Sequence, residues 1–175
     1  MNEITDRIEK QIHVKAPRAR VWRAIADSTQ FGEWFGVHIE GPWQVGRPMR
    51  GTFNMTFTQE GIDEALARYD LPPAPIASTL PDVFCVVEAM EPEERFSFRW
   101  IPYGLDAGID PQTEPKTLVE FRLQDAAEGT LISVTESGFD KVPLARRRRA
   151  FLMNTGGWQA QLDNIAAYLQ SSAHG

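Results

Sequence analysis

The last long segment of the chain, residues 142–170, most constrains the fold. Its apolar residues recur at spacings of three, four and seven, which predicts one buried stripe along an α-helix. The stripe consists of Leu144, Phe151, Leu152, Thr155, Trp158, Leu162, Ile165 and Leu169. The opposite face carries polar residues, including Arg146, Arg149, Gln161, Asp163 and Asn164. Pro143 suits the first helical position, because its ring fixes a helical φ and it has no N–H to leave unpaired. Such a helix needs the rest of the chain to cover its apolar stripe.

The segments before this helix predict an antiparallel sheet. Alternating apolar residues indicate strands at residues 4–14, 51–58, 84–90, 96–100, 119–123 and 130–139. Short turns join several of these strands, and strands joined in this way are antiparallel. In the second strand Phe53, Met55 and Phe57 would share the inner face, whereas Ser97, Arg99, Glu120, Arg122, Ser133 and Thr135 would lie on the outer face of the sheet.

Two short helices are predicted directly after the first strand. Pro17 opens the first one, the run Asp27-Ser28-Thr29 separates them, and the second ends near Gly36. Two long loops, 58–82 and 101–116, contain several prolines, although one short helix is expected within the first of them. We expect the loops to act as rims or lids. The whole chain, 1–175, then forms one α+β domain in which a curved antiparallel sheet closes on the final helix.

Composition excludes several classes of function. The net charge of −6 disfavours nucleic acid as a partner, and no apolar run is long enough for a membrane span. The first residues do not resemble a signal peptide, so a cytoplasmic location is expected. Cys85 is the one cysteine, and His13, His38 and His174 are scattered without metal-site spacing. We therefore expect no metal and no cofactor, and no motif of a covalent hydrolase or nucleotide enzyme is present.

Several motifs along the chain resemble one protein family. They are Ala16-Pro17, Val21-Trp22, Phe31-Gly32-Glu33-Trp34-Phe35, Arg95-Phe96-Ser97-Phe98-Arg99-Trp100, Glu136-Ser137-Gly138-Phe139 and Asn154-Thr155-Gly156-Gly157-Trp158. Together they resemble the heat-shock-protein ATPase activator homologue family, part of the START-like (SRPBCC, Bet v-like) helix-grip superfamily. The resemblance implies a helix-grip fold over nearly the whole chain. It says little about function, because the superfamily includes lipid carriers, hormone receptors, cyclases, oxygenase subunits and co-chaperone domains.

Two glycines inside the final helix are unusual. Gly156 and Gly157 each cost about 1 kcal/mol relative to alanine in a helix interior, so a positional reason is expected. Either the backbone packs closely against a neighbouring strand there, or a missing side chain leaves room for a ligand. Trp158 follows on the buried stripe, where its indole N–H needs a partner.

Glu136 is the most informative polar residue. It shares the inward face of its strand with Ile132 and Val134, and an isolated buried carboxylate is too costly to remain unpaired. Its partners would be backbone amides near the start of the final helix, or an arginine. Alternatively, Glu136 is a polar anchor or an acid/base group at the mouth of a cavity. It is the one candidate for a catalytic residue.

The function predicted is the binding of a small apolar or amphipathic molecule between the sheet and the final helix. The ligand-binding candidates are Trp34, Phe35, Phe53, Phe57, Phe98, Trp100, Phe121, Glu136, Met153, Gly157 and Trp158. Two alternatives stay open: a cyclase- or hydratase-type enzyme that uses Glu136, and a co-chaperone-like domain that binds a protein through its surface. A homodimer also stays open. Of the block Arg146-Arg147-Arg148-Arg149, two or three are expected to be solvated and some to pair with acids.

Overall fold

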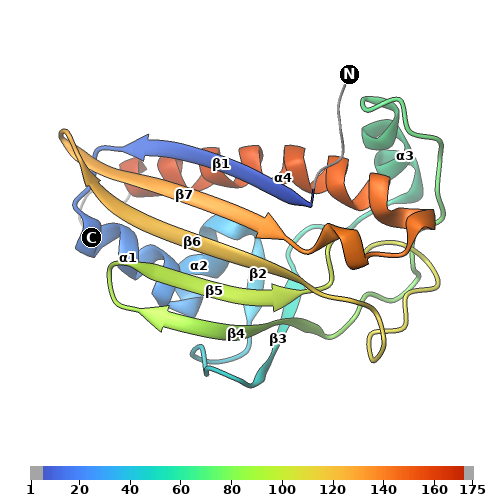
Figure 1. The fold of residues 1–175 in the computed structure, drawn as a ribbon, viewed down its shortest axis with the longest axis horizontal. Helices are drawn as coiled ribbons and strands as arrows, with labels where there is room; N and C mark the ends of the chain where they lie inside the picture. The colour runs from blue at the N-terminus through green and yellow to red at the C-terminus, as the bar shows by residue number, and fades with distance from the viewer. Residues whose placement is uncertain (1–5, 172–175) are drawn as a thin grey trace.

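The computed structural model describes residues 6–171. They form one seven-stranded antiparallel sheet packed against a long C-terminal helix, with shorter helices at its ends (Figure 1). The strands are β1 (Arg7–Val14), β2 (Val37–Ile39), β3 (Pro48–Phe53), β4 (Val83–Glu91), β5 (Arg95–Trp100), β6 (Thr117–Ala126) and β7 (Gly129–Ser137). The helices are α1 (Arg18–Ala26), α2 (Ser28–Phe35), α3 (Gln59–Ala67), the 3₁₀ turn η1 (Phe139–Lys141) and α4 (Leu144–Ser171). The predicted α+β architecture is confirmed. Ile4, which is predicted in the first strand, and His174 lie outside the described residues.

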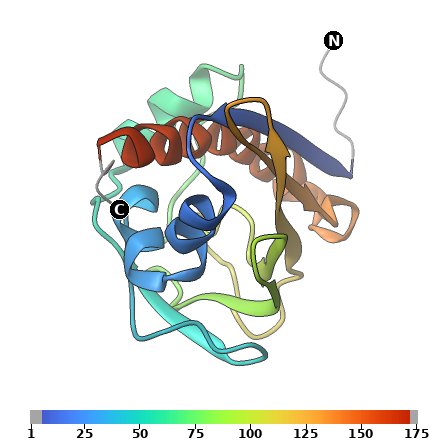
Figure 2. The same ribbon diagram turned by 90° about the vertical axis from the view of Figure 1, so that its left-hand side faces the viewer.

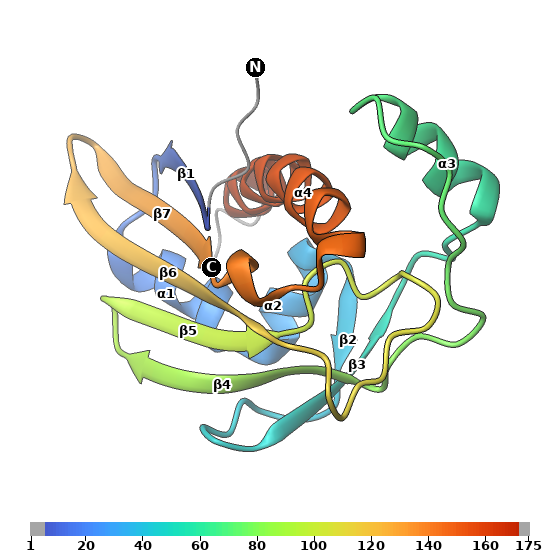
Figure 3. The same cartoon turned by 45° about the vertical axis from the view of Figure 1, so that its right-hand side comes forward.

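The sheet curves around α4. Its strand order is β1-β7-β6-β5-β4-β3-β2, so the first strand of the chain pairs with the last. Figure 3 shows the concave face of the sheet turned toward α4, and Figure 2 shows α1 and α2 closing one end. In the β6–β7 hairpin Phe121 lies opposite Val134 and Leu123 opposite Ile132, so their apolar side chains share the inner face.

The break between α1 and α2 comes from Asp27, as predicted. Its carboxylate Oδ1 accepts hydrogen bonds from the backbone N–H groups of Thr29 (2.9 Å) and Gln30 (3.2 Å), which caps the start of α2. Gly36 ends α2 with a φ of 89°, a left-handed conformation that glycine adopts without strain. The Trp34 indole N–H donates to the carbonyl of Ala24 at 2.7 Å and ties the two helices together.

The final helix differs in two ways from the prediction. It runs over Leu144–Ser171, and Pro143 precedes its first residue while its carbonyl accepts the N–H groups of Arg146 and Arg147. Leu144 is 80% exposed and does not belong to the buried stripe, whereas Arg146 is buried and does not lie on a solvated face. The rest of the stripe, from Phe151 to Leu169, contributes to the core, and only Thr155 is half-buried.

One expectation about the strands is wrong. The strand predicted over 51–58 is β3, which ends at Phe53, so the chain leaves the sheet and Met55 is 66% exposed. Ser97 lies opposite Glu120 in the β5–β6 pair, on the predicted outer face, although it is only 1% exposed. Among residues 6–171, no helix combines the length and apolarity that crossing a membrane requires.

Candidate functional site

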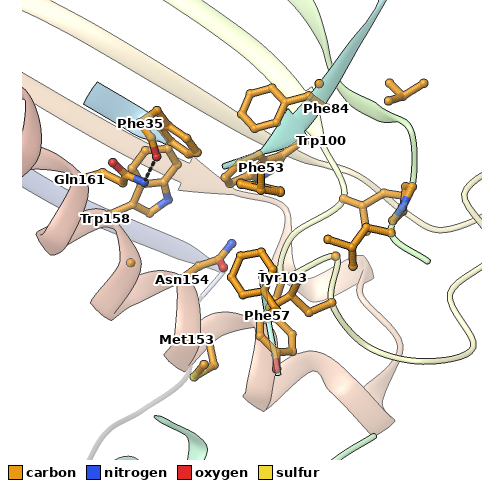
Figure 4. A pocket seen from close by; sticks show the side chains of 18 of the residues that line it. Phe35, Phe53, Phe57, Phe84, Trp100, Tyr103, Met153, Asn154, Trp158 and Gln161 are labelled. Carbon is orange, nitrogen blue, oxygen red and sulfur yellow. Dashed lines mark hydrogen bonds between the residues drawn. The ribbon is translucent and has the colours of Figure 1, made fainter. Parts of the chain in front are cut away.

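A pocket of about 300 Å³ lies between α4, the inner face of the sheet and the two long loops (Figure 4). Seven of its lining residues are aromatic: Phe35, Phe53, Phe57, Phe84, Trp100, Tyr103 and Trp158. The loops add Leu80, Pro81, Ile101, Gly104 and Leu105. The pocket is thus a mainly apolar, aromatic-walled space of the kind that holds small molecules.

One face of α4 supplies the helical wall of the pocket. Met153, Asn154, Gly157, Trp158 and Gln161 all line it, and their spacing places them on adjacent turns of one helix face. The Gln161 side-chain amide donates to the carbonyl of Phe35 at 3.0 Å, as the dashed line in Figure 4 shows. Gln161 therefore faces inward, although the sequence pattern placed it on the outer face of the helix.

The two glycines of α4 have different roles. A Cβ added to Gly156 would lie 1.8 Å from the hydroxyl oxygen of Tyr69. The absence of a side chain at Gly156 therefore allows Tyr69, just after α3, to pack against α4. Gly157 is exposed and lines the pocket, and a Cβ added to it would meet no heavy atom within 4 Å. Gly156 is explained by close packing, but against Tyr69 and not against a strand. Gly157 leaves open space in the pocket.

Glu136 lies behind the pocket wall, and its side chain is fully buried. Its Oε2 accepts hydrogen bonds from the Thr117 hydroxyl (2.6 Å) and the Trp100 indole N–H (2.8 Å). Its Oε1 accepts the Trp158 indole N–H (2.8 Å), and the Asn154 amide reaches both oxygens at 3.0 and 3.2 Å. The prediction that backbone amides or an arginine pair with Glu136 is therefore wrong. Neutral side chains from β5, β6 and α4 surround its carboxyl group.

Two opposing effects act on the pKa of Glu136. Burial raises it above its usual range, because a charged carboxylate loses its hydration. The hydrogen bonds from Thr117, Trp100, Trp158 and Asn154 act in the opposite direction, and the net direction is upward. An indole N–H and an amide NH₂ can only donate, so most of this shell suits the carboxylate form.

Tyr103 is the other unusual polar residue of the pocket wall. It has a φ of 48°, in the left-handed region that is costly for a residue with a side chain. Its hydroxyl is buried and has no hydrogen-bond partner among the described residues. Burial, together with nearby Asp106, raises the pKa of Tyr103 to about 12.

A buried ion-pair network fixes the loop that carries Tyr103. The Arg146 guanidinium donates to Glu114 (2.7 Å), to Asp106 (3.1 Å) and to the carbonyls of Pro102 (2.7 Å) and Tyr103 (3.2 Å). Arg149 donates to the second Asp106 oxygen at 2.8 Å. Of the four consecutive arginines, the first and last are thus paired with acids.

The two long loops also bind each other. Ile76 and Asp106 form an isolated antiparallel bridge. The Ala77 N–H donates to the carbonyl of Leu105 at 2.8 Å, and the Ala107 N–H to that of Pro75 at 3.0 Å. Both loops contribute residues to the pocket wall, so one connected layer closes this side of it.

The structure brings together most of the predicted ligand-binding residues. Seven of them line the pocket: Phe35, Phe53, Phe57, Trp100, Met153, Gly157 and Trp158. Glu136 lies directly behind them, whereas Trp34, Phe98 and Phe121 lie in the adjacent core and not in the lining. Sequence reasoning missed Phe84, Tyr103, Asn154 and Gln161. Asn154 could have been found from its position three residues before Gly157 on the same helix face.

Other reactive groups lie away from this pocket. Within residues 6–171, no three His, Cys, Asp or Glu residues cluster closely enough to hold a metal ion. Cys85 is buried in β4, and burial raises the pKa of its thiol. A buried neutral thiol is a poor nucleophile.

Comparison with known proteins identifies the family. A family described as "Activator of Hsp90 ATPase homolog 1-like protein" matches residues 15–170. No curated protein sequence matches the chain.

Solved structures share the fold. Protein MLL2253 from Mesorhizobium loti is similar with a TM-score of 0.66 at 19% identity, covering 95% of this chain and 98% of that one. A protein from Bordetella parapertussis, encoded by gene BPP1335, gives a TM-score of 0.61 at 24% identity, covering 97% and 77%. CalU16 from Micromonospora echinospora gives 0.57 at 18% identity, covering 93% and 75%. On the match over residues 15–170, the chain belongs to the Activator of Hsp90 ATPase homolog 1-like family.

Proposed function

We propose that this protein binds a small apolar or amphipathic molecule in the pocket between α4, the sheet and the two loops. The observation that carries the proposal is Gly157. A glycine in the middle of a long helix costs about 1 kcal/mol relative to alanine, and this one lines the aromatic pocket at an exposed position. Simple core packing does not require a glycine at a position where a methyl group would meet nothing.

The size and lining of the pocket support this proposal. Its volume of about 300 Å³ lies at the lower end of the range for ligand sites, roughly 300–1,000 Å³. The aromatic walls would supply affinity by burying the apolar body of the ligand. Asn154 and Gln161 are polar groups on the α4 side, where they would orient a polar end.

The observations give less support to an enzyme. An acid/base mechanism would be favoured by two titratable groups that face each other across the cavity. Among the described residues that line the pocket, only Tyr103 has an ionisable side chain. The other lining residues are apolar or neutral. The Glu136 carboxyl lies behind Trp100 and Trp158, where it would not reach a substrate without movement of these side chains.

A co-chaperone-like surface also has less support. The outer face of the sheet carries ion pairs such as Arg99–Glu88 (2.9 Å) and Arg122–Glu120 (2.6 Å). A charged face of this kind does not form the large apolar patch that a protein-binding surface of the proposed type would need.

Titration with the neutral fluorescent probe N-phenyl-1-naphthylamine tests the proposal. We expect saturable 1:1 binding to the wild-type protein, because the probe is apolar and aromatic. In Gly157→Leu, an isobutyl side chain would occupy part of the pocket, and we expect the affinity for the probe to fall by at least about tenfold.

The matched control is Ala160→Leu, which adds similar bulk at an exposed position of the same helix. Circular dichroism would show that both variants fold. Equal probe affinity in Gly157→Leu and Ala160→Leu would contradict the proposal, because a ligand in this pocket must be displaced by the first substitution and not by the second.

A further inference from the structure

The buried carboxyl of Glu136 has no cationic partner. All five of its hydrogen-bond contacts come from neutral side chains. None of the ion pairs within residues 6–171 includes Glu136. Buried charges in proteins are normally paired, so the carboxylate form of Glu136 lacks a compensating positive charge in this structure.

The pocket in front of Glu136 does not contain that charge either. None of the described residues that line it is Arg, Lys or His. The nearby Arg146 and Arg149 are already compensated, because they pair with Asp106 and Glu114. The field of Glu136 in the pocket therefore remains uncancelled, and the net charge of −6 on the whole chain has the same sign.

The side chains that separate Glu136 from the pocket are suited to a cation. Trp100 and Trp158 both donate their indole N–H groups to the carboxyl and both line the pocket. Their ring centroids are 5.6 Å apart, and Phe35 lies 6.1 Å from each of them. Aromatic faces attract cations, most strongly those of tryptophan. An indole that donates its N–H to an anion is polarised so that its ring becomes more electron-rich.

Asn154 adds an acceptor at the same wall. Its NH₂ group is used on Glu136, and no described residue donates a hydrogen bond to its carbonyl oxygen. Figure 4 places the Asn154 side chain beside Trp158 at the edge of the pocket. An ammonium group can donate to such an oxygen, whereas a carboxylate ligand cannot.

We propose that the pocket prefers organic cations, namely amphipathic amines or quaternary ammonium compounds whose charged end lies against Trp100 and Trp158 in front of Glu136. This inference rests on the proposed function, since it assigns a ligand class to the same pocket. The proposed preference for cations can be distinguished from simple apolar binding, because an ammonium group loses more hydration on burial than a hydroxyl group does. In a purely apolar pocket the neutral ligand would bind more tightly.

Competition against bound N-phenyl-1-naphthylamine by three matched compounds tests the inference. The compounds are 4-phenylbutylamine, 4-phenylbutanol and 5-phenylpentanoate, which share one phenylbutyl body and carry a positive, neutral or negative end at neutral pH. We expect the amine to bind roughly tenfold more tightly than the alcohol, and the carboxylate to bind more weakly than both. In Glu136→Gln the ratio of amine affinity to alcohol affinity should fall to less than about twofold.

The outcomes separate the two proposals. If the naphthylamine probe binds but the alcohol competes as well as or better than the amine in the wild-type protein, the cation preference is refuted and the proposed function stands. If the probe itself does not bind, both are refuted. The wild-type series decides the question even if Glu136→Gln proves too unstable to assay. Where that variant folds, an unchanged preference for the amine would overturn the role of Glu136.

Discussion

The neighbouring glycines of α4 allow the packing argument to be tested with a matched pair. In Gly157→Ala the new methyl group would meet no heavy atom within 4 Å, so the substitution adds helix propensity without a clash. The expected gain is about 1 kcal/mol in the free energy of unfolding. For a domain of this size that corresponds to a rise in melting temperature of roughly 2–4 °C.

The same substitution one residue earlier should give a different result. The Cβ of Gly156→Ala would lie 1.8 Å from the Tyr69 hydroxyl oxygen and 3.1 Å from Cζ, so Tyr69 must move away from α4. Tyr69 lies just after α3 and is half-buried against the core, so its displacement disturbs that packing. We expect the gain in propensity to be lost, which leaves Gly156→Ala at least about 1 kcal/mol less stable than Gly157→Ala.

Urea unfolding followed by far-ultraviolet circular dichroism measures both free energies. Tyr69→Phe removes the oxygen at 1.8 Å, so combining it with Gly156→Ala should recover part of the loss, and the double-mutant cycle isolates this contact. Equal stabilisation by the two glycine substitutions would refute the reasoning, as would a clear loss of stability in Gly157→Ala.

Four further experiments test the polar groups around the pocket. Glu136→Ala leaves its buried donors unpaired and should destabilise the fold by about 3–5 kcal/mol in urea unfolding, more than it changes ligand affinity; unchanged stability with lost binding would reverse that ranking. Because the folded pKa of Glu136 is raised above its ordinary 4.5, the stability from this group is full below that pH and is lost as the pH rises through the folded value. The stability of wild type relative to Glu136→Gln should therefore fall as the pH rises from 4.5 toward the raised pKa of Glu136, and a rise would contradict the assignment. Tyr103→Phe removes a buried hydroxyl that has no hydrogen-bond partner, so the free energy of unfolding should stay unchanged or rise by about 1 kcal/mol. A clear loss of stability would show that the hydroxyl has a hydrogen-bond partner in solution. Arg146→Met leaves the carboxylates of Asp106 and Glu114 with less compensating positive charge, and should lower the free energy of unfolding by about 3–5 kcal/mol. The control Arg148→Met, at an exposed position, should lower it by less than about 0.5 kcal/mol. Similar melting temperatures for the two variants would contradict this.

Local patterns were enough to predict the regular elements. Period-two alternation located β4 to β7 and their aromatic inner face, and the helical period located α4. The run Asp27-Ser28-Thr29 located the break between α1 and α2, where the structure shows Asp27 capping α2. Each of these signals depends on residues close together in the chain, where backbone geometry alone decides which side chains share a face.

The errors arose where distant residues decide the environment. Arg146 is buried because Asp106 and Glu114 of another loop compensate it, and a charge at a helix start does not reveal such partners. Met55 is exposed because the strand ends two residues earlier, which alternation does not show. Tyr103 lies in a loop without periodicity, so its position in the pocket wall depends on the ion-pair network of Arg146.

Three departures from ordinary local preference border the same pocket. Gly157 weakens a helix, Tyr103 adopts a left-handed backbone conformation, and Glu136 is a buried carboxyl without a cation. Each costs stability, by about 1 kcal/mol for the glycine and about 1–2 kcal/mol for the left-handed residue. Selection for stability alone would favour alanine at position 157 and glycine at position 103, and would not require a buried carboxyl group with its shell of donors at position 136. Their convergence on one cavity is expected if the cavity itself is selected, because functional sites are where local rules are broken. On this reasoning Gly157→Ala should improve the fold and impair the pocket in the same molecule.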